Sequence, residues 1–203
     1  MTLALHRTTE TNAKKIKEEG FRCAVYPSEK SPYYNKCGTF FDPISIIDKV
    51  IEDGKERLQL IKDEYTRALR EEEENKTDPR IQKLISIRKA RGEYIIPEYK
   101  RSDRFKEEIE NGMSFVLADI DESKALVGDG ILEGTGELYK SKVVTLKDFN
   151  SKKLSKSYEF PEIFYENNVP KQNVLKILSV SELENVVHRC DSDEKCIKKL
   201  ITR

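Results

Sequence analysis

The stretch LALHRTTETNAKKIKEEGF, residues 3–21, has the pattern of a β-strand that turns into a helix. Leu3 and Leu5 alternate with polar neighbours, as in a strand with one buried face. Thr11-Asn12 offers a cap for the helix that follows, and Gly20 is expected to end it. His6 therefore lies near the C-terminal end of the first strand. It is either a strand histidine satisfied by backbone hydrogen bonds or a residue that lines a site.

The composition of the 203-residue chain narrows the class of protein. Charged residues make up 36%, and the 37 Lys and Arg residues balance 37 Asp and Glu residues. This balance argues against a large uniform field for nucleic acid or membrane and leaves room only for a local basic patch. The N-terminus lacks a signal-peptide pattern and no stretch is apolar enough to cross a membrane. We expect no membrane partner, and a protein that is cytoplasmic or exported without a cleavable signal peptide.

The order of the expected elements indicates an α+β fold. A short strand is expected over Gly38–Phe41, ended by Asp42-Pro43. Amphipathic spacing and caps predict a helical block over about 44–111, in which Thr77-Asp78 followed by Pro79 starts a second helix. After Gly112, short runs rich in Val, Ile, Leu, Phe and Tyr predict strands, one of them over 137–146, and two helices close the chain. We therefore expect one domain over 1–203, with an antiparallel or mixed sheet and a helical insertion.

The four cysteines form two local pairs, Cys23 with Cys37 and Cys190 with Cys196, without CxxC spacing. The simplest interpretation is reduced thiols in a cytoplasmic protein. Two disulfides in an exported protein are the first alternative. A zinc site through Cys190, Cys196 and His188 is the second.

Three motifs together resemble the ADP-ribosyltransferase superfamily, which includes poly(ADP-ribose) polymerases and bacterial toxins that modify proteins or DNA. The first motif is His6-Arg7-Thr8 followed at family spacing by Asn12, Ile16, Gly20 and Phe21. The second is the aromatic strand Gly38–Phe41. The third is FPEIFYENNVPKQNVLKIL, residues 160–178, with a glutamate at 162 and a Val-Pro turn. The helical block lies outside the resemblance.

The resemblance implies a split-sheet transferase core that consumes NAD as a substrate and needs no metal. Glu162 takes the place of the catalytic glutamate, and His6 is the donor for a ribose hydroxyl. The implied nicotinamide and phosphate contacts are Arg7, Thr8, Phe40 and Phe41. Arg7 stands where many members have glycine, and its guanidinium could reach a phosphate. Phe40 stands where the family often has tyrosine.

Two other carboxylates compete with Glu162 as the catalytic group. Glu159 has opposite parity in a regular strand, so only one of the two can point into a cleft. Glu137, on the preceding expected strand, is a weaker candidate. The apolar run and the proline turn that follow Glu162 favour it.

The function implied by the resemblance is cleavage of the nicotinamide-ribose bond of NAD with transfer of mono-ADP-ribose to a macromolecule. The acceptor is a protein side chain or a nucleic-acid base, and the protein is a toxin or effector on this interpretation. A catalytically degenerate member of the fold that acts as a binding protein is the alternative. An NAD-dependent RNA 2′-phosphotransferase is a third, which two histidines in the whole chain do not favour.

Overall fold

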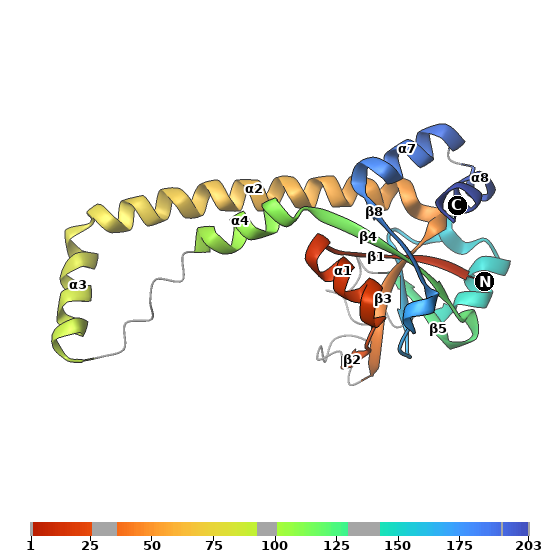
Figure 1. The fold of residues 1–203 in the computed structure, drawn as a ribbon, viewed down its shortest axis with the longest axis horizontal. Helices are drawn as coiled ribbons and strands as arrows, with labels where there is room; N and C mark the ends of the chain where they lie inside the picture. The colour runs from red at the N-terminus through yellow and green to blue at the C-terminus, as the bar shows by residue number, and fades with distance from the viewer. Residues whose placement is uncertain (1, 26–35, 93–100, 130–142, 192, 203) are drawn as a thin grey trace. The chain divides into compact units, whose positions relative to one another are not determined.

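The computed structural model describes residues 2–25, 36–92, 101–129, 143–191 and 193–202 (Figure 1). Over these residues the chain is α+β with a mostly antiparallel sheet, as the sequence predicts. It divides into two compact units. The first combines Met1–Gly54 with Met113–Arg203, and the second is Lys55–Gly112.

The first unit is built on one sheet whose strands pair antiparallel. The strand order is β6-β5-β7-β3-β1-β4-β8, and β2 adds to β3. The strands are β1 Thr2–Thr9, β2 Ala24–Val25, β3 Cys37–Pro43, β4 Met113–Ile120, β5 Ala125–Asp129, β6 Val144–Thr145, β7 Pro161–Tyr165 and β8 Val174–Ser179. Strands far apart in the sequence therefore lie side by side, with β7 next to β3 and β3 next to β1.

Helices cover the two faces of this sheet and bury an apolar core on each (Figure 1). One core packs α1 (Glu10–Glu19) and α6 (Leu146–Ser151) against residues such as Phe41 and Ile163. The other packs the 3₁₀ turn η1 (Ile44–Ile46), the start of α2 (Ile47–Thr77), α7 (Val180–Cys190) and α8 (Glu194–Ile201) against Leu5 and Leu117. Short 3₁₀ turns η2 (Glu122–Lys124), η4 (Leu154–Ser157) and η5 (Lys171–Asn173) connect the strands. Because side chains alternate along a strand, neighbouring residues of β1 enter different cores.

The first helix begins two residues earlier than the sequence suggests. The side chain of Thr9, and not Thr11-Asn12, accepts the hydrogen bond from the backbone N–H of Asn12. A threonine in extended conformation can cap a helix only from the position before its first turn. The consequence is that β1 runs directly into α1 without a loop.

The second unit contains most of the expected helical block. It consists of the rest of α2, α3 (Pro79–Ala90) and α4 (Arg101–Asn111). Asp78 caps α3 and Pro79 follows at its first turn, as predicted. The carboxylate of Glu72 accepts hydrogen bonds from the backbone and hydroxyl of Ser102, which joins α2 to α4. Residues 44–54 of the expected block belong to the first unit, since five of them lie in its core: Ile44, Ile46, Ile47, Val50 and Ile51.

Two sequence expectations differ from the structure near the strands. Asp42 and Pro43 do not end β3, because they pair with Leu5 and Ala4 of β1. Leu146, expected at the end of a strand, begins the short helix α6. Glu137 and the greater part of that expected strand lie outside the described residues.

The cysteines form two disulfides, so the first interpretation, reduced thiols, is wrong for this structure. Cys23 is bonded to Cys37 and Cys190 to Cys196, with Cα–Cα distances of 5.4 and 5.5 Å. The first bond links β3 to the segment between α1 and β2. The second joins the end of α7 to the first turn of α8, where the zinc alternative had placed a metal.

Candidate functional site

The sheet of the first unit opens between β1 and β3, next to His6. β1 pairs with β4 along all of Thr2–Thr9, but with β3 only through Ala4–Pro43 and Leu5–Asp42. Beyond these pairs the backbone of β1 from His6 to Thr9 has no ladder partner in β3. The sheet is therefore split at the point where the first two motifs face each other.

His6 occupies the split. Its Nδ1 lies 2.8 Å from the carbonyl oxygen of Phe40, across the gap. Its ring meets the rings of Phe21 and Phe41 edge-on, at centroid distances of 5.0 and 5.7 Å. Burial lowers the pKa of His6 below its usual 6.5. The hydrogen bond to Phe40 raises this pKa, whereas the positive charge of Arg7 lowers it further. The imidazole is thus neutral at pH 7.

The tautomer of His6 follows from its partner. A carbonyl oxygen can only accept, so Nδ1 carries the proton and donates it to Phe40. In a neutral ring the other nitrogen, Nε2, is then an acceptor. The sequence predicts that His6 donates a hydrogen bond to a ribose hydroxyl. In the structure the remaining ring nitrogen, Nε2, could only accept a hydrogen bond from such a hydroxyl.

The two phenylalanines of β3 lie on opposite faces. Phe41 is buried against Phe21, His6 and Tyr165. Phe40 is half-buried and packs against the ring of Phe164, with centroids 5.1 Å apart. The aromatic side chain that accompanies His6 is therefore Phe41, whereas Phe40 contributes its carbonyl group.

Arg7 is held by two aspartates. Its Nε and Nη2 donate to the carboxylate of Asp42 at 2.9 and 3.3 Å, and its Nη1 pairs with Asp53 of α2. The guanidinium also lies over the ring of Phe160, 5.2 Å from its centroid. A phosphate would have to displace these carboxylates, so the predicted phosphate contact stays a prediction. Thr8, one residue on, shares the face of His6.

Asp42 is a buried carboxyl that sequence reasoning did not single out. Only 3% of the residue is exposed. Burial raises its pKa to about 6, against the lowering by the charge and hydrogen bonds of Arg7. Its position in FFDP, immediately before a proline, is the only signal that could have found it.

Glu162 is half-buried in β7, opposite Gly128 of β5. Glu159 lies before the strand and is exposed, so the parity argument against it does not apply. The buried Asp129 accepts hydrogen bonds from the backbone N–H groups of Glu159 and Phe160, both at 2.8 Å, and so fixes the start of β7.

The structure brings the motif strands together but places their side chains on two faces. His6 and Phe41 belong to the face with Ile163. Alternation puts Glu162 on the other face, along with Asp42, its neighbour by extension of the β3–β7 register. Two strand spacings separate β1 from β7, about 10 Å. A ligand that meets both His6 and Glu162 would have to cross the split.

The first and third motifs touch directly at their ends. Phe21 and Val169 form an antiparallel bridge with hydrogen bonds of 2.8 and 3.0 Å. Gly20 lies beneath this bridge with a φ of +83°. A Cβ at Gly20 would stand 2.4 Å from the carbonyl oxygen of Val169. The glycine of the first motif and the Val-Pro turn of the third are therefore parts of one contact.

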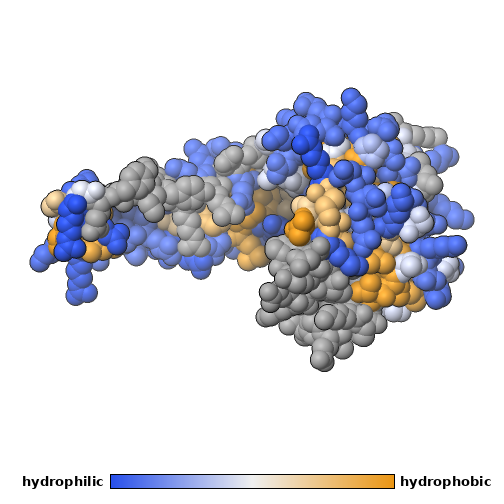
Figure 2. Space-filling view, turned by 90° about the horizontal axis from the view of Figure 1, so that it is seen from below, coloured by the Kyte–Doolittle hydropathy of each residue, from blue (hydrophilic) through white to orange (hydrophobic). Residues whose placement is uncertain are grey.

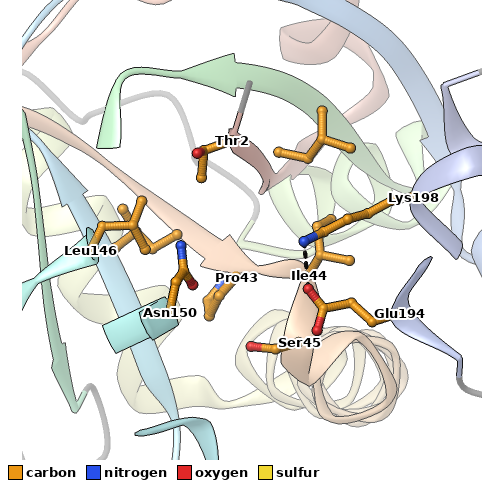
Figure 3. Close-up of a pocket in the computed structure, with 10 residues that line it drawn as sticks. Thr2, Pro43, Ile44, Ser45, Leu146, Asn150, Glu194 and Lys198 are labelled. Atoms are coloured by element: carbon orange, nitrogen blue, oxygen red, sulfur yellow. Dashed lines mark ion pairs between the residues drawn. The ribbon is translucent and has the colours of Figure 1, made fainter. Parts of the chain in front are cut away.

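A small polar pocket lies at the other end of β1 (Figure 3). Thr2, Ser45 and Asn150 line it, and the ion pair of Lys198 with Glu194, 2.5 Å long, stands at its side. Thr2 is four residues from His6, about 13 Å along the strand. None of the predicted site residues lines this pocket, so it is separate from the split beside His6.

Neither a metal site nor a membrane-spanning helix is found among the described residues. No group of three or more His, Cys, Asp and Glu side chains there could hold a metal ion. No helix there is long and apolar enough to cross a membrane.

Comparison of the chain with protein-family models, curated proteins and solved structures finds no match.

Proposed function

We propose that the protein cleaves NAD and transfers mono-ADP-ribose to a macromolecular acceptor. The observation that carries the proposal is the adjacency of the three motif strands. β1 with His6, β3 with Phe40 and Phe41, and β7 with Glu162 are neighbours, although up to 156 positions separate their residues in the sequence. The sheet is split beside His6. These features support the split-sheet transferase fold that the resemblance implies.

The residues at the split suit the chemistry of NAD cleavage. The nicotinamide-ribose bond breaks with oxocarbenium character, like a glycosidic bond. Neutral His6 would accept a hydrogen bond from a ribose hydroxyl through Nε2. The Glu162 carboxylate would stabilise the positive charge that develops on the ribose. The half-buried ring of Phe40, at the edge of the split, would offer apolar surface to the nicotinamide ring.

NAD would lie across the opening in the sheet and not along one face. The β1–β3 ladder ends at Leu5 and Asp42, and a ligand held beyond this point would contact residues of both strands. The Phe21–Val169 bridge ties the β1–α1 corner to the turn after β7. This bridge fixes the distance between the two motifs, as a site that orients the ribose requires.

The experiment is an NAD hydrolysis assay on purified protein with two matched variants. Glu162→Gln should lower turnover about a hundredfold or more while NAD affinity changes little, because the contact strengthens in the transition state. Glu159→Gln is the control, since this side chain is exposed before the strand. Full activity in both variants would show that β7 supplies no catalytic carboxylate. The reverse pattern would assign the role to Glu159.

A second candidate is a degenerate member of the same fold that binds a partner without turnover. The engagement of Arg7 by Asp42 and Asp53 favours it, because the cation nearest His6 is already neutralised. NAD binding by calorimetry without measurable hydrolysis would support this candidate. For the first candidate, the transferase, the proposal covers a protein side chain and a nucleic-acid base as acceptors.

A further inference from the structure

The Cys23–Cys37 disulfide joins the two segments that hold His6 in place. One segment carries Phe21, whose ring meets the imidazole edge-on at a centroid distance of 5.0 Å. The other is β3, where the carbonyl oxygen of Phe40 lies 2.8 Å from Nδ1 of His6. Cys23 comes two residues after Phe21. Cys37 comes three residues before Phe40. One covalent bond therefore links the aromatic contact of the imidazole to its hydrogen bond.

The backbone pairing that joins these two segments is short. β2 pairs with β3 through two residue pairs, and so short a ladder is marginal by itself. Other anchors run from each segment to β7 and the turn after it. Phe21 bridges Val169, and β3 pairs with β7 over Thr39–Phe41. These anchors keep the sheet assembled when the disulfide opens, whereas the spacing of the two segments depends on the disulfide.

The two disulfides of the chain differ in exposure. Cys23 and Cys37 are both exposed, whereas Cys190 is buried and Cys196 is half-buried. Thiol–disulfide exchange begins when a thiolate attacks one sulfur, so its rate depends on access to the bond. Hydrophilic side chains make up most of the face of the first unit seen in Figure 2, with hydrophobic patches between them. A water-soluble dithiol is therefore the class of reductant that suits this surface, and Cys23–Cys37 is the bond that it reaches first.

We infer that the Cys23–Cys37 disulfide is a redox switch that fixes His6 in the split when oxidised and releases it when a dithiol reduces the bond. A thiolate of the dithiol attacks one cysteine sulfur, which forms a mixed disulfide and frees the other cysteine as a thiolate that takes up a proton. The second thiol of the reductant then attacks the reductant's own sulfur in the mixed disulfide, which frees the second cysteine. Two electrons and two protons pass to the cysteines, and the dithiol leaves as a cyclic disulfide. The inference concerns the geometry of His6 and stands whether or not the split binds NAD.

Reduction should change His6 and its surroundings in two measurable ways. Burial is the strongest influence on the pKa of His6, so release of the segments should raise this pKa towards 6.5. The proton that the Phe40 carbonyl now holds on Nδ1 should then be shared between Nδ1 and Nε2. Local opening of the segments should become about a hundredfold more frequent, because a disulfide that closes a loop of about 15 residues restricts the opened chain by that factor.

The test follows both histidines by NMR in the full chain, without NAD, before and after treatment with dithiothreitol. The chain has two histidines, so His188 of α7 serves as the internal reference. Reduction should shift the titration midpoint of His6 upwards and mix its tautomers, while the signals of His188 stay in place. Hydrogen exchange at the Phe21 amide, which donates to Val169, should become about a hundredfold faster. Thiol labelling followed by mass spectrometry identifies which disulfide has opened.

Two double variants separate the effects of the two disulfides. Cys23→Ser/Cys37→Ser should show the reduced-state signals of His6 without reductant and should not respond further to it. Cys190→Ser/Cys196→Ser is the matched control, which should keep the oxidised-state signals and the full response to dithiothreitol. Wild-type protein reduced in place gives the reduced state without a substitution, so the test does not depend on how well either variant folds.

Three outcomes would overturn the inference. The first is unchanged His6 signals in protein whose Cys23–Cys37 bond is shown to be open. The second is reduction of the other disulfide before this one, which would contradict the argument from access. The third is an equal rise in hydrogen exchange at Phe21 and at the buried Leu117 of β4, which would show that the bond holds the whole fold and not the split.

Discussion

Replacement of Gly20 by alanine tests whether the first and third motifs form one contact. Gly20 has φ +83° and ψ 179°, a region open almost only to glycine, and a side chain there costs about 1–3 kcal/mol. Its Cβ would lie 2.4 Å from the oxygen of Val169 and 2.9 Å from the nitrogen of Lys171. Both are backbone atoms, so the turn must move.

The displaced turn would lose the two hydrogen bonds between Phe21 and Val169, each worth about 1 kcal/mol net. The expected loss in the free energy of unfolding is therefore about 4 kcal/mol, the sum of strain and lost bonds. For a chain of this size, each kcal/mol lowers the melting temperature by about 2–4 °C. Urea unfolding followed by circular dichroism measures the loss, and faster hydrogen exchange at the Val169 amide locates it.

Gly92→Ala is the matched control. Gly92 also has positive φ, +65°, but a Cβ there meets nothing within 4 Å. It should cost only the backbone term, about 1–2 kcal/mol. If Gly20→Ala costs no more than Gly92→Ala, the packing of Gly20 against Val169 contributes nothing and the reasoning fails.

Three other predictions concern charge, disulfides and NAD. Because the raised pKa of Asp42 disfavours its ionised form, its contribution to stability is greatest below pH 3.8 and is lost as pH rises through about 6. The stability of Asp42→Asn relative to the wild type should therefore rise by about 3 kcal/mol between pH 3 and pH 7.5, and an equal difference at both pH values in denaturant titrations would contradict this. Reductant should lower stability by about 3 kcal/mol through the Cys23–Cys37 bond, whose cysteines are 14 residues apart, and Cys23→Ser/Cys37→Ser should abolish that share of the response in urea titrations. NAD at a hundredfold excess over its Kd should raise the free energy of unfolding by about 2.7 kcal/mol in a thermal-shift assay, and no shift together with no heat in calorimetry would remove NAD as a ligand.

The sequence determined the local elements best where several signals agree. The first strand and helix were predicted from Leu3, Leu5 and the helix-ending Gly20. Asp78 and Pro79 placed the start of α3. Helix caps, hydrophobic periodicity and helix-ending glycines depend on only a few neighbouring residues, so the sequence predicts them without knowledge of the tertiary structure. The sequence predicts the first helix cap at Thr11-Asn12, whereas the structure has it at Thr9. Threonine and asparagine are both good caps, and the position of the cap depends on where β1 ends.

The tertiary structure decided which side chains meet. The motifs predict that His6, Phe40 and Glu162 form one site. Strand alternation instead places His6 with Phe41 on one face of the sheet and Glu162 on the other face. A shift of one residue in register exchanges the faces of a strand, and register depends on partners more than thirty positions away.

The Arg7–Asp42 ion pair and the Cys23–Cys37 disulfide also depend on tertiary structure. The sequence gives no sign that Asp42 would hold Arg7, since strand pairing between β1 and β3 brings them together. Cys23 and Cys37 have no diagnostic spacing, and only the pairing of β2 with β3 brings them within bonding distance. The sequence by itself thus determined the fold class and most of the helices and strands, whereas the fold decided their neighbours, because pairing and burial depend on residues distant in the chain.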